Sequence, residues 1–336
     1  MSRRASLLAA ALSVLLWTGC DSDSSPAPES QPPKPRPTVA PSTQPPDDRR
    51  PAQPTLAARA PWKPSDAESF PNAKTLAASF AQAVTTFPAG STPASVASSA
   101  GAGTKLNRAE LADRISPLVS ASDASAGEVI YPQMAGHAER SAGVMVLVRQ
   151  ATLDARGTRR SVTRVLDVRL SRRPPGPWRL ERLGGIGGSA TSPPAALPRE
   201  ARRALVHPGL FLPDSARWDV FRGEVDPALL DALADAADRR PISVLVLKSG
   251  HPRNVWSTAR RSAHSAGRAA DVYAIAGQLV AHQRRAGSAA YRAARELVRA
   301  GAAQVGSPWT FGVGRRSFTD VIHEDHLHIH QRAGTQ

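Results

Sequence analysis

Histidine is concentrated in two short segments near the end of this 336-residue chain. The first segment, Ser262–Val272, contains His264 and Asp271, which are seven positions apart. The second, Asp320–His330, holds four of the nine histidines within eight residues. Histidine is the commonest side-chain metal ligand, because neutral imidazole offers a lone pair near physiological pH. We therefore expect a fold that brings the two segments together around a metal ion.

The spacing of the second segment suggests which side chains face the metal. In a strand, residues two apart face the same side, so His326, His328 and His330 would share a face, with Glu324 beside them. A catalytic zinc site needs three protein ligands and one open position. The histidine and aspartate of the first segment, with one histidine of the second, can supply them. Zinc lowers the pKa of bound water and polarises a carbonyl, and a nearby acid or imidazole then handles protons.

The first segment resembles a known signature. Ser262, His264, Gly267 and Asp271 match the pattern Ser-x-His-x-x-Gly-x-Ala-x-Asp of the LAS zinc peptidases. That group includes VanY-type D,D-carboxypeptidases (peptidase M15), D-Ala-D-Ala dipeptidases and the penicillin-insensitive murein endopeptidase, and the Hedgehog signalling domain shares its fold. The resemblance extends over about residues 226–331 and implies zinc as the cofactor.

The closing motif is similar to the endopeptidase pattern His-x-x-His-x-His, here running from His323 to His328. By that match the zinc ligands are His264, Asp271 and His328, and His326 is the active-site imidazole. VanY-like members place a glutamate three residues before the last ligand, where this chain has Asp325, preceded by Glu324. The match therefore does not choose between His326, Asp325 and Glu324 as the residue that transfers protons.

A looser match concerns the segment that follows an expected strand at Ile242–Leu247. Ser249–Arg253 occupies the place of the family's Ser-x-Tyr-Arg segment. By that match Arg253 binds a substrate carboxylate or the developing oxyanion, for which a planar, always charged guanidinium is suited. We interpret His251 and His282 as ordinary surface histidines.

The N-terminus predicts export. Residues 1–20 combine Arg3 and Arg4 with a short apolar run and end at Cys20, in a segment that resembles a bacterial lipobox. Cys20 is the only cysteine, so we expect it to carry a lipid that anchors the protein to a bacterial membrane, on the periplasmic or cell-envelope face. Residues 21–64 are rich in Pro and Ser and are expected to form a disordered tether.

The remainder predicts an α+β fold with two small domains. Residues 65–186 show helical periodicity followed by strand-like segments, which favours helices plus an antiparallel meander of unknown function. Residues 187–197 are expected to form a linker. Residues 198–332 should form the LAS-type domain, an antiparallel sheet with flanking helices. The individual elements expected are helices near Ala73–Phe87, Leu106–Leu118, Asp226–Arg239 and Ala289–Ala300, and strands near Val144–Arg149, Val162–Leu170, Trp178–Leu183 and Ile242–Leu247.

Charge and compartment indicate the substrate. The net charge is +15, which favours acidic partners such as the carboxylate-rich cell wall. Aromatic residues make up only 5% and no nucleic-acid motif is present, which argues against nucleic-acid binding. We expect a monomeric, lipid-anchored zinc metallopeptidase acting on peptidoglycan stem peptides or cross-links. The alternatives are a non-catalytic zinc-containing module that binds wall peptides or a protein, and a structural envelope lipoprotein.

Overall fold

The computed structural model describes residues 55–332, which belong to one compact unit. The predicted signal segment, Cys20 and the tether up to residue 54 lie outside the described residues. None of the helices between residues 55 and 332 is both long enough and apolar enough to span a bilayer.

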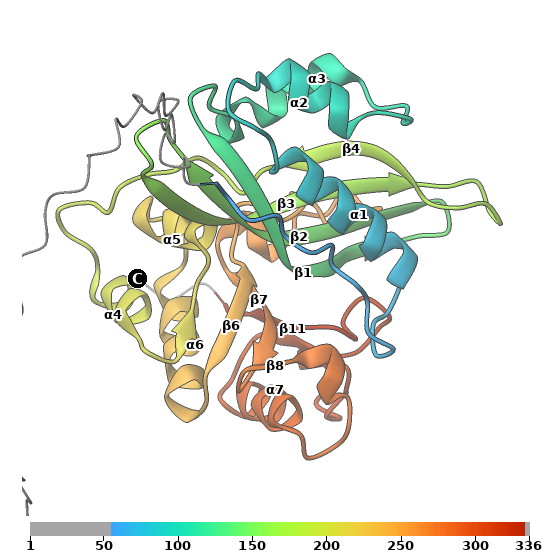
Figure 1. The fold of residues 1–336 in the computed structure, drawn as a ribbon. Coiled ribbons are helices and arrows are strands. Elements are labelled where there is room, and N and C mark those ends of the chain that lie inside the picture. The colour runs from blue at the N-terminus through green and yellow to red at the C-terminus, as the bar shows by residue number, and fades with distance from the viewer. Residues whose placement is uncertain (1–54, 333–336) are drawn as a thin grey trace, which may run out of the picture. The chain divides into compact units, whose positions relative to one another are not determined.

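The N-terminal half is a four-stranded antiparallel meander with helices on one face (Figure 1). The sheet order is β1-β2-β3-β4, and α1 runs across the sheet, packing its buried alanines, Phe80 and Val84 against the core. The strands are β1 (Ala124–His137), β2 (Ser141–Leu153), β3 (Arg159–Ser171) and β4 (Arg179–Gly185), and the helices are α1 (Pro71–Val84), α2 (Pro93–Ala100), α3 (Arg108–Ile115) and the 3-10 turn η1 (Ser116–Leu118).

The C-terminal half is built on a seven-stranded mixed sheet in the order β10-β9-β11-β7-β6-β5, with β8 paired to β7. The β5–β6 and β9–β10 pairs are parallel, and the other pairs are antiparallel. The strands are β5 (Leu210–Phe211), β6 (Ile242–Val246), β7 (Ala269–Ile275), β8 (Gln278–Leu279), β9 (Gln304–Gly306), β10 (Ser317–Phe318) and β11 (Leu327–His330). The helices are α4 (Arg199–Val206), α5 (Asp214–Phe221), α6 (Pro227–Arg239) and α7 (Ala289–Arg299), with 3-10 turns η2 (Ala263–Ala266), η3 (Val280–Gln283) and η4 (Gly314–Arg316).

The α+β class is confirmed, with seven α-helices among residues 55–332. The expectation of a purely antiparallel second sheet is wrong, because short edge strands at both sides pair in parallel. Local capping explains two helices well: the Asp226 side chain caps α6, and Thr92 and Ser95 form a capping box at α2. The division into domains 65–186 and 198–332 stays a prediction.

The two sheets share an apolar seam on the face of the N-terminal sheet opposite α1. Tyr131, Met145, Leu147 and Val165 from the first three strands pack against Leu245 and Val246. Tyr131 also stacks on Tyr273 of β7, with ring centroids 5.5 Å apart. Burial of apolar surface on this scale favours a fixed contact between the halves. As a result β1 lies beside the part of the second sheet that carries the histidine segments.

Candidate metal centre

His264 sits in the short η2 turn, whose ends explain the signature around it. Ser262 caps the turn by accepting a hydrogen bond from the His264 amide. Gly267 ends it with φ 68°, and a Cβ there would lie 2.0 Å from the carbonyl oxygen of Glu224. The backbone conformation and the close contact both require glycine. The serine and the glycine therefore hold His264 in place on the way into β7.

Asp271 and His328 are brought together by strand register. β7 and β11 are antiparallel, and His328 pairs directly with Asp271. Directly opposite residues in such a pair point to the same face of the sheet, with their Cβ atoms about 5 Å apart. Sheet pairing thus joins residues 57 positions apart in the sequence.

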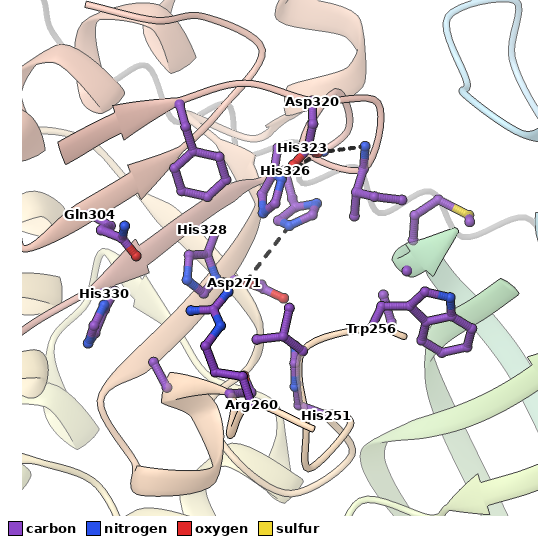
Figure 2. A pocket seen from close by; sticks show the side chains of 18 of the residues that line it. His251, Trp256, Arg260, Asp271, Gln304, Asp320, His323, His326, His328 and His330 are labelled. Atoms are coloured by element: carbon purple, nitrogen blue, oxygen red, sulfur yellow. Dashed lines mark hydrogen bonds and ion pairs between the residues drawn. The ribbon is translucent and has the colours of Figure 1, made fainter. Parts of the chain in front are cut away.

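Three side-chain atoms converge at this point, and Figure 2 shows two of the residues, Asp271 and His328, next to each other. His264 Nε2 lies 3.2 Å from Asp271 Oδ1 and 3.2 Å from His328 Nδ1, and Asp271 Oδ1 lies 3.0 Å from His328 Nδ1. Ligands about 2.0–2.1 Å from a tetrahedral zinc ion would be about 3.3 Å apart. The separations and the donor types therefore fit a bound metal ion.

The protonation states of His264, Asp271 and His328 also suit the binding of a cation. His264 Nδ1 donates to the carbonyl oxygen of Leu247 at 2.6 Å, which leaves its Nε2 as a lone pair. This is the arrangement usual for metal-binding histidines. Burial lowers the pKa of His328 to about 4, so its ring is neutral at pH 7. Burial alone would raise the pKa of Asp271, but the adjacent His264 and His326 hold it well below its usual value.

His251 lies against the same group, so its interpretation as a surface histidine is wrong. His251, His264 and Asp271 place one donor atom each within 4.8 Å of one another, and this triad could bind a metal ion. The His251 ring, however, stacks on His264 with centroids 3.8 Å apart and planes 11° apart. An imidazole lone pair lies in the ring plane, so two parallel rings do not aim at one point. His328, tilted by 54° from His264, is better placed as the third ligand.

His326 precedes β11, yet it faces the same point. Its Nε2 lies 3.8 Å from Asp271 Oδ1, and its Nδ1 donates to Asp325 Oδ1 at 2.6 Å. Burial tends to lower the pKa of His326, but the carboxylates of Asp271 and Asp325 outweigh it and the pKa is raised. His326 therefore presents one ring nitrogen to the centre while an aspartate holds the other.

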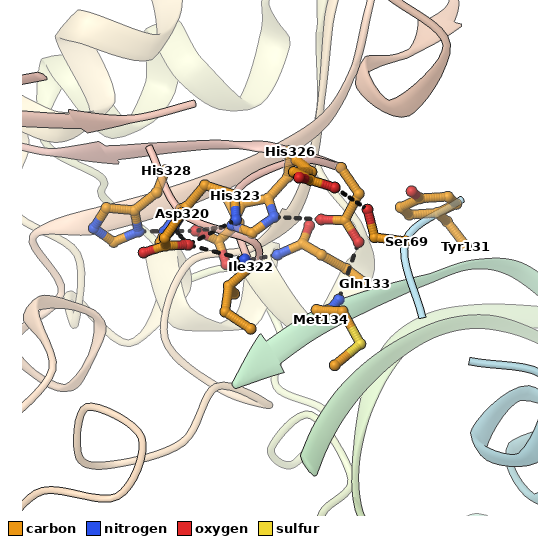
Figure 3. A network of polar contacts seen from close by, with 12 residues as sticks. Ser69, Tyr131, Gln133, Met134, Asp320, Ile322, His323, His326 and His328 are labelled. Atoms are coloured by element: carbon orange, nitrogen blue, oxygen red, sulfur yellow. Dashed lines mark hydrogen bonds and ion pairs between the residues drawn. The ribbon is translucent and has the colours of Figure 1, made fainter. Parts of the chain in front are cut away.

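Asp325 is held from the N-terminal half, where Gln133 and Met134 lie close to His326 (Figure 3). Its Oδ2 lies 2.6 Å from Lys74 Nζ of α1 and accepts from the Met134 amide of β1 at 3.2 Å. Burial alone would raise the pKa of Asp325, but Lys74 and the His326 hydrogen bond bring it down to about 2. Gln133, next to Met134, donates from Nε2 to Asp271 Oδ2 at 2.8 Å.

The other predicted site residues lie elsewhere. Glu324 is in a turn before β11 and is bound by Ser69 Oγ at 2.5 Å and Arg284 at 2.9 Å, so it does not share the face of the strand histidines. Arg253 is exposed and lines a second hollow of about 470 Å³, beyond His251. His282 is exposed, as expected.

The convergent groups open into a cleft of about 510 Å³. Asp271, His326 and His328 form part of its wall, and segment 134–138 of β1 forms another part. The cleft also contains arginines that the sequence did not single out as ligands: Arg260, Arg261 and Arg268. The charged side chains of the lining are these three arginines and the two acids Asp271 and Asp320, so arginine is in excess, which suits a substrate that carries carboxylates.

Trp256 anchors the loop that carries two of these arginines. The indole lies over the paired glycines Gly136 of β1 and Gly143 of β2, where an added Cβ would approach it to 2.2 Å and 2.5 Å. Arg169 covers the ring, with its guanidinium carbon 4.7 Å from the centroid. The two glycines therefore form a notch that fixes the position of the loop against the N-terminal sheet.

Neither the family-model scan, nor the curated proteins, nor the solved structures yielded a match to this chain.

Proposed function

We propose that this chain is a zinc metallopeptidase of the LAS type that hydrolyses peptide bonds of peptidoglycan stem peptides or cross-links. The proposal is carried by the convergence of His264 Nε2, Asp271 Oδ1 and His328 Nδ1 to within 3.2 Å, beside a cleft lined by Asp271, His328 and the oriented imidazole of His326. Two histidines and one carboxylate are a ligand set of catalytic zinc sites. A Hedgehog-type fold for the C-terminal half is part of this proposal.

The chain's own groups support a hydrolytic role. A zinc ion bound by the three ligands would lower the pKa of a water molecule and polarise a substrate carbonyl. His326 Nε2 would accept the proton of the attacking water and return it to the leaving amine. Asp325 keeps the His326 Nδ1–H oriented, as the aspartate does in other His–Asp pairs. Among the three candidates for proton transfer, this favours His326, with Asp325 supporting it and Glu324 outside the reaction.

The basic cleft supports an acidic peptide as substrate. Arg260, Arg261 and Arg268 are within the cleft lining and could hold substrate carboxylates by planar, paired hydrogen bonds. Arg253 could take part only where a substrate extends into the second hollow. Attachment of lipid to Cys20 would place the cleft at the cell envelope, where such peptides occur; this part of the proposal rests on the N-terminal sequence.

Digestion of purified muropeptides tests the function. The zinc-loaded protein should release cleaved peptides that mass spectrometry detects, and His264→Ala should abolish cleavage. His282→Ala, which alters an exposed histidine away from the cleft, is the matched control and should keep full activity. Equal digestion by wild type and His264→Ala contradicts the proposal.

The same experiment decides between the peptidase and the binding module. A wild-type protein that binds one zinc ion and retains muropeptides without cleaving them would support the non-catalytic alternative. The His326–Asp325 pair favours the enzyme, because it supplies an oriented imidazole beside the proposed metal. A purely structural zinc site has four protein ligands and no open position, whereas the three proposed ligands leave one position open.

A further inference from the structure

Gln133 connects the N-terminal sheet to the metal centre. Its side chain is fully buried, and its Nε2 donates to Asp271 Oδ2 at 2.8 Å. The other oxygen of the same carboxylate, Oδ1, faces His264 and His328. Each oxygen of Asp271 thus has its own contact, one with the ligand cluster and one with β1.

The orientation of the Gln133 amide follows from this contact. An ionised carboxylate only accepts hydrogen bonds, so the NH₂ group of Gln133 must face it. Its Oε1 is then left buried with no hydrogen-bond partner among the described residues. A buried unsatisfied acceptor destabilises a fold, and an apolar side chain of similar size would avoid that cost. The presence of an amide here, despite that cost, indicates a role at Asp271.

The backbone at this point of β1 is irregular. The register between β1 and β2 shifts between Met134 and Gly136, and such bulges are common beside functional sites because they redirect neighbouring groups. Here the Gln133 side chain reaches Asp271 while the Met134 amide donates to Asp325 Oδ2. Two consecutive residues of one strand therefore contact the carboxylate of a ligand and the carboxylate that orients His326.

We propose that the N-terminal α+β half completes the metal centre, with Gln133 acting as a positioning residue for the ligand Asp271. This inference rests on the metal site of the proposed function. By holding Oδ2, Gln133 fixes the rotation of the carboxylate and keeps Oδ1 directed at His264 and His328. Hydrogen bonds of this kind, one step removed from the metal, typically change metal affinity by about 10–100-fold when they are lost.

Metal affinity of Gln133→Met tests the inference, because methionine keeps the length of the side chain and removes the amide. Gln150→Met is the matched control: Gln150 is also a buried glutamine of the same sheet, but it donates to the Leu118 carbonyl and to Ser125. Zinc affinity is measured by competition with a chromogenic chelator, and the visible spectrum of the cobalt-substituted protein reports ligand geometry.

We expect Gln133→Met to bind zinc about 10–100-fold more weakly and to shift the cobalt spectrum, while Gln150→Met matches the wild type. Equal affinity in wild type and Gln133→Met overturns the inference, and so does an equal loss in both variants, which would reflect general damage to the sheet. If Gln133→Met does not fold, Gln133→Asn, which keeps the amide but shortens its reach, must show the loss. A wild type that binds no zinc overturns the proposed function itself, a result distinct from these.

Discussion

The ammonium group of Lys74 lies 2.6 Å from Asp325 Oδ2, and both side chains are fully buried. Lys74 also pairs with Glu68, so one cation serves two buried carboxylates. Asp325 in turn accepts a hydrogen bond from His326. A continuous polar chain therefore runs from α1 to the imidazole at the metal centre, and its charge balance depends on one lysine.

Lys74→Met should destabilise the fold strongly. Removing one partner of a buried ion pair costs about 3–5 kcal/mol, because the other charge stays buried without compensation. Here the carboxylates of Glu68 and Asp325 would both stay buried without the lysine that pairs with them. Urea unfolding should show the loss, and adding Glu68→Gln to the same chain should recover part of it. Lys105→Met, at an exposed lysine, should change the free energy of unfolding little; similar losses in both variants would contradict the argument.

The pH dependence of the unfolding free energy should show the lowered pKa of Asp325. Lys74 and His326 hold its pKa at about 2 in the folded chain, below the value of about 3.9 in an unfolded one. Its stabilisation is therefore complete above pH about 4 and is lost as the pH falls towards 2, by about 2 kcal/mol. The difference in unfolding free energy between metal-free wild type and Asp325→Asn should shrink across that window. A difference that stays constant from pH 5 to pH 2 would show that Asp325 titrates normally.

The meeting of His264, Asp271 and His328 could be predicted from the sequence because all three belong to compact patterns, and their role as metal ligands stays a prediction. Ser262, His264, Gly267 and Asp271 lie within ten positions, and their spacing follows from a capped turn that leads into a strand. The position of His328 follows from simple strand pairing. Local geometry of this kind produces a characteristic spacing of residues in the sequence. The α+β class and most helices were predictable for the same reason.

The residues of the N-terminal half that contact the site show no comparable pattern in the sequence. Gln133 and Asp271 are 138 positions apart, and Met134 and Asp325 are 191 apart. β1, rich in alanine and glycine, lacks the alternation that marks a half-buried strand, so the sequence does not predict the strand that carries Gln133. The position of His251 is not predictable from its own neighbours in the sequence, because its burial comes from stacking on His264. These contacts depend on how two sheets pack together.

His328→Ala and His251→Ala should separate the two candidate third ligands. The tilt of His328 relative to His264 lets both lone pairs meet at one point, whereas the stacked His251 ring does not allow this. We expect His328→Ala to lose more zinc affinity than the roughly 10–100-fold expected for a supporting hydrogen bond, and His251→Ala to lose less. Isothermal titration with zinc measures both. The reverse order would make His251 the ligand.

Gly136→Ala should displace the loop anchored by Trp256. The added methyl group would lie 2.2 Å from the indole, and overpacking of this kind costs about 1–3 kcal/mol. Tryptophan fluorescence should change and the KM for muropeptides should rise, because the loop carries Arg260 and Arg261, while zinc affinity stays constant. Gly185→Ala in β4, where an added Cβ meets no atom nearer than 4.0 Å, is the matched control. Unchanged fluorescence in Gly136→Ala would show that the notch does not position the loop.

His326→Ala should lower kcat while leaving the metal in place. His326 Nε2 faces the centre, whereas Glu324 is bound by Ser69 and Arg284. Loss of a positioned acid–base group costs about 10²–10⁴-fold in rate, so we expect that loss in His326→Ala and near-wild-type turnover in Glu324→Gln. Zinc content, measured by mass spectrometry, should stay at one ion per chain in both. His330→Ala, at another histidine of the cleft, controls for lining changes. A large loss in Glu324→Gln with full activity in His326→Ala would assign proton transfer to the glutamate and require the turn before β11 to rearrange when substrate binds.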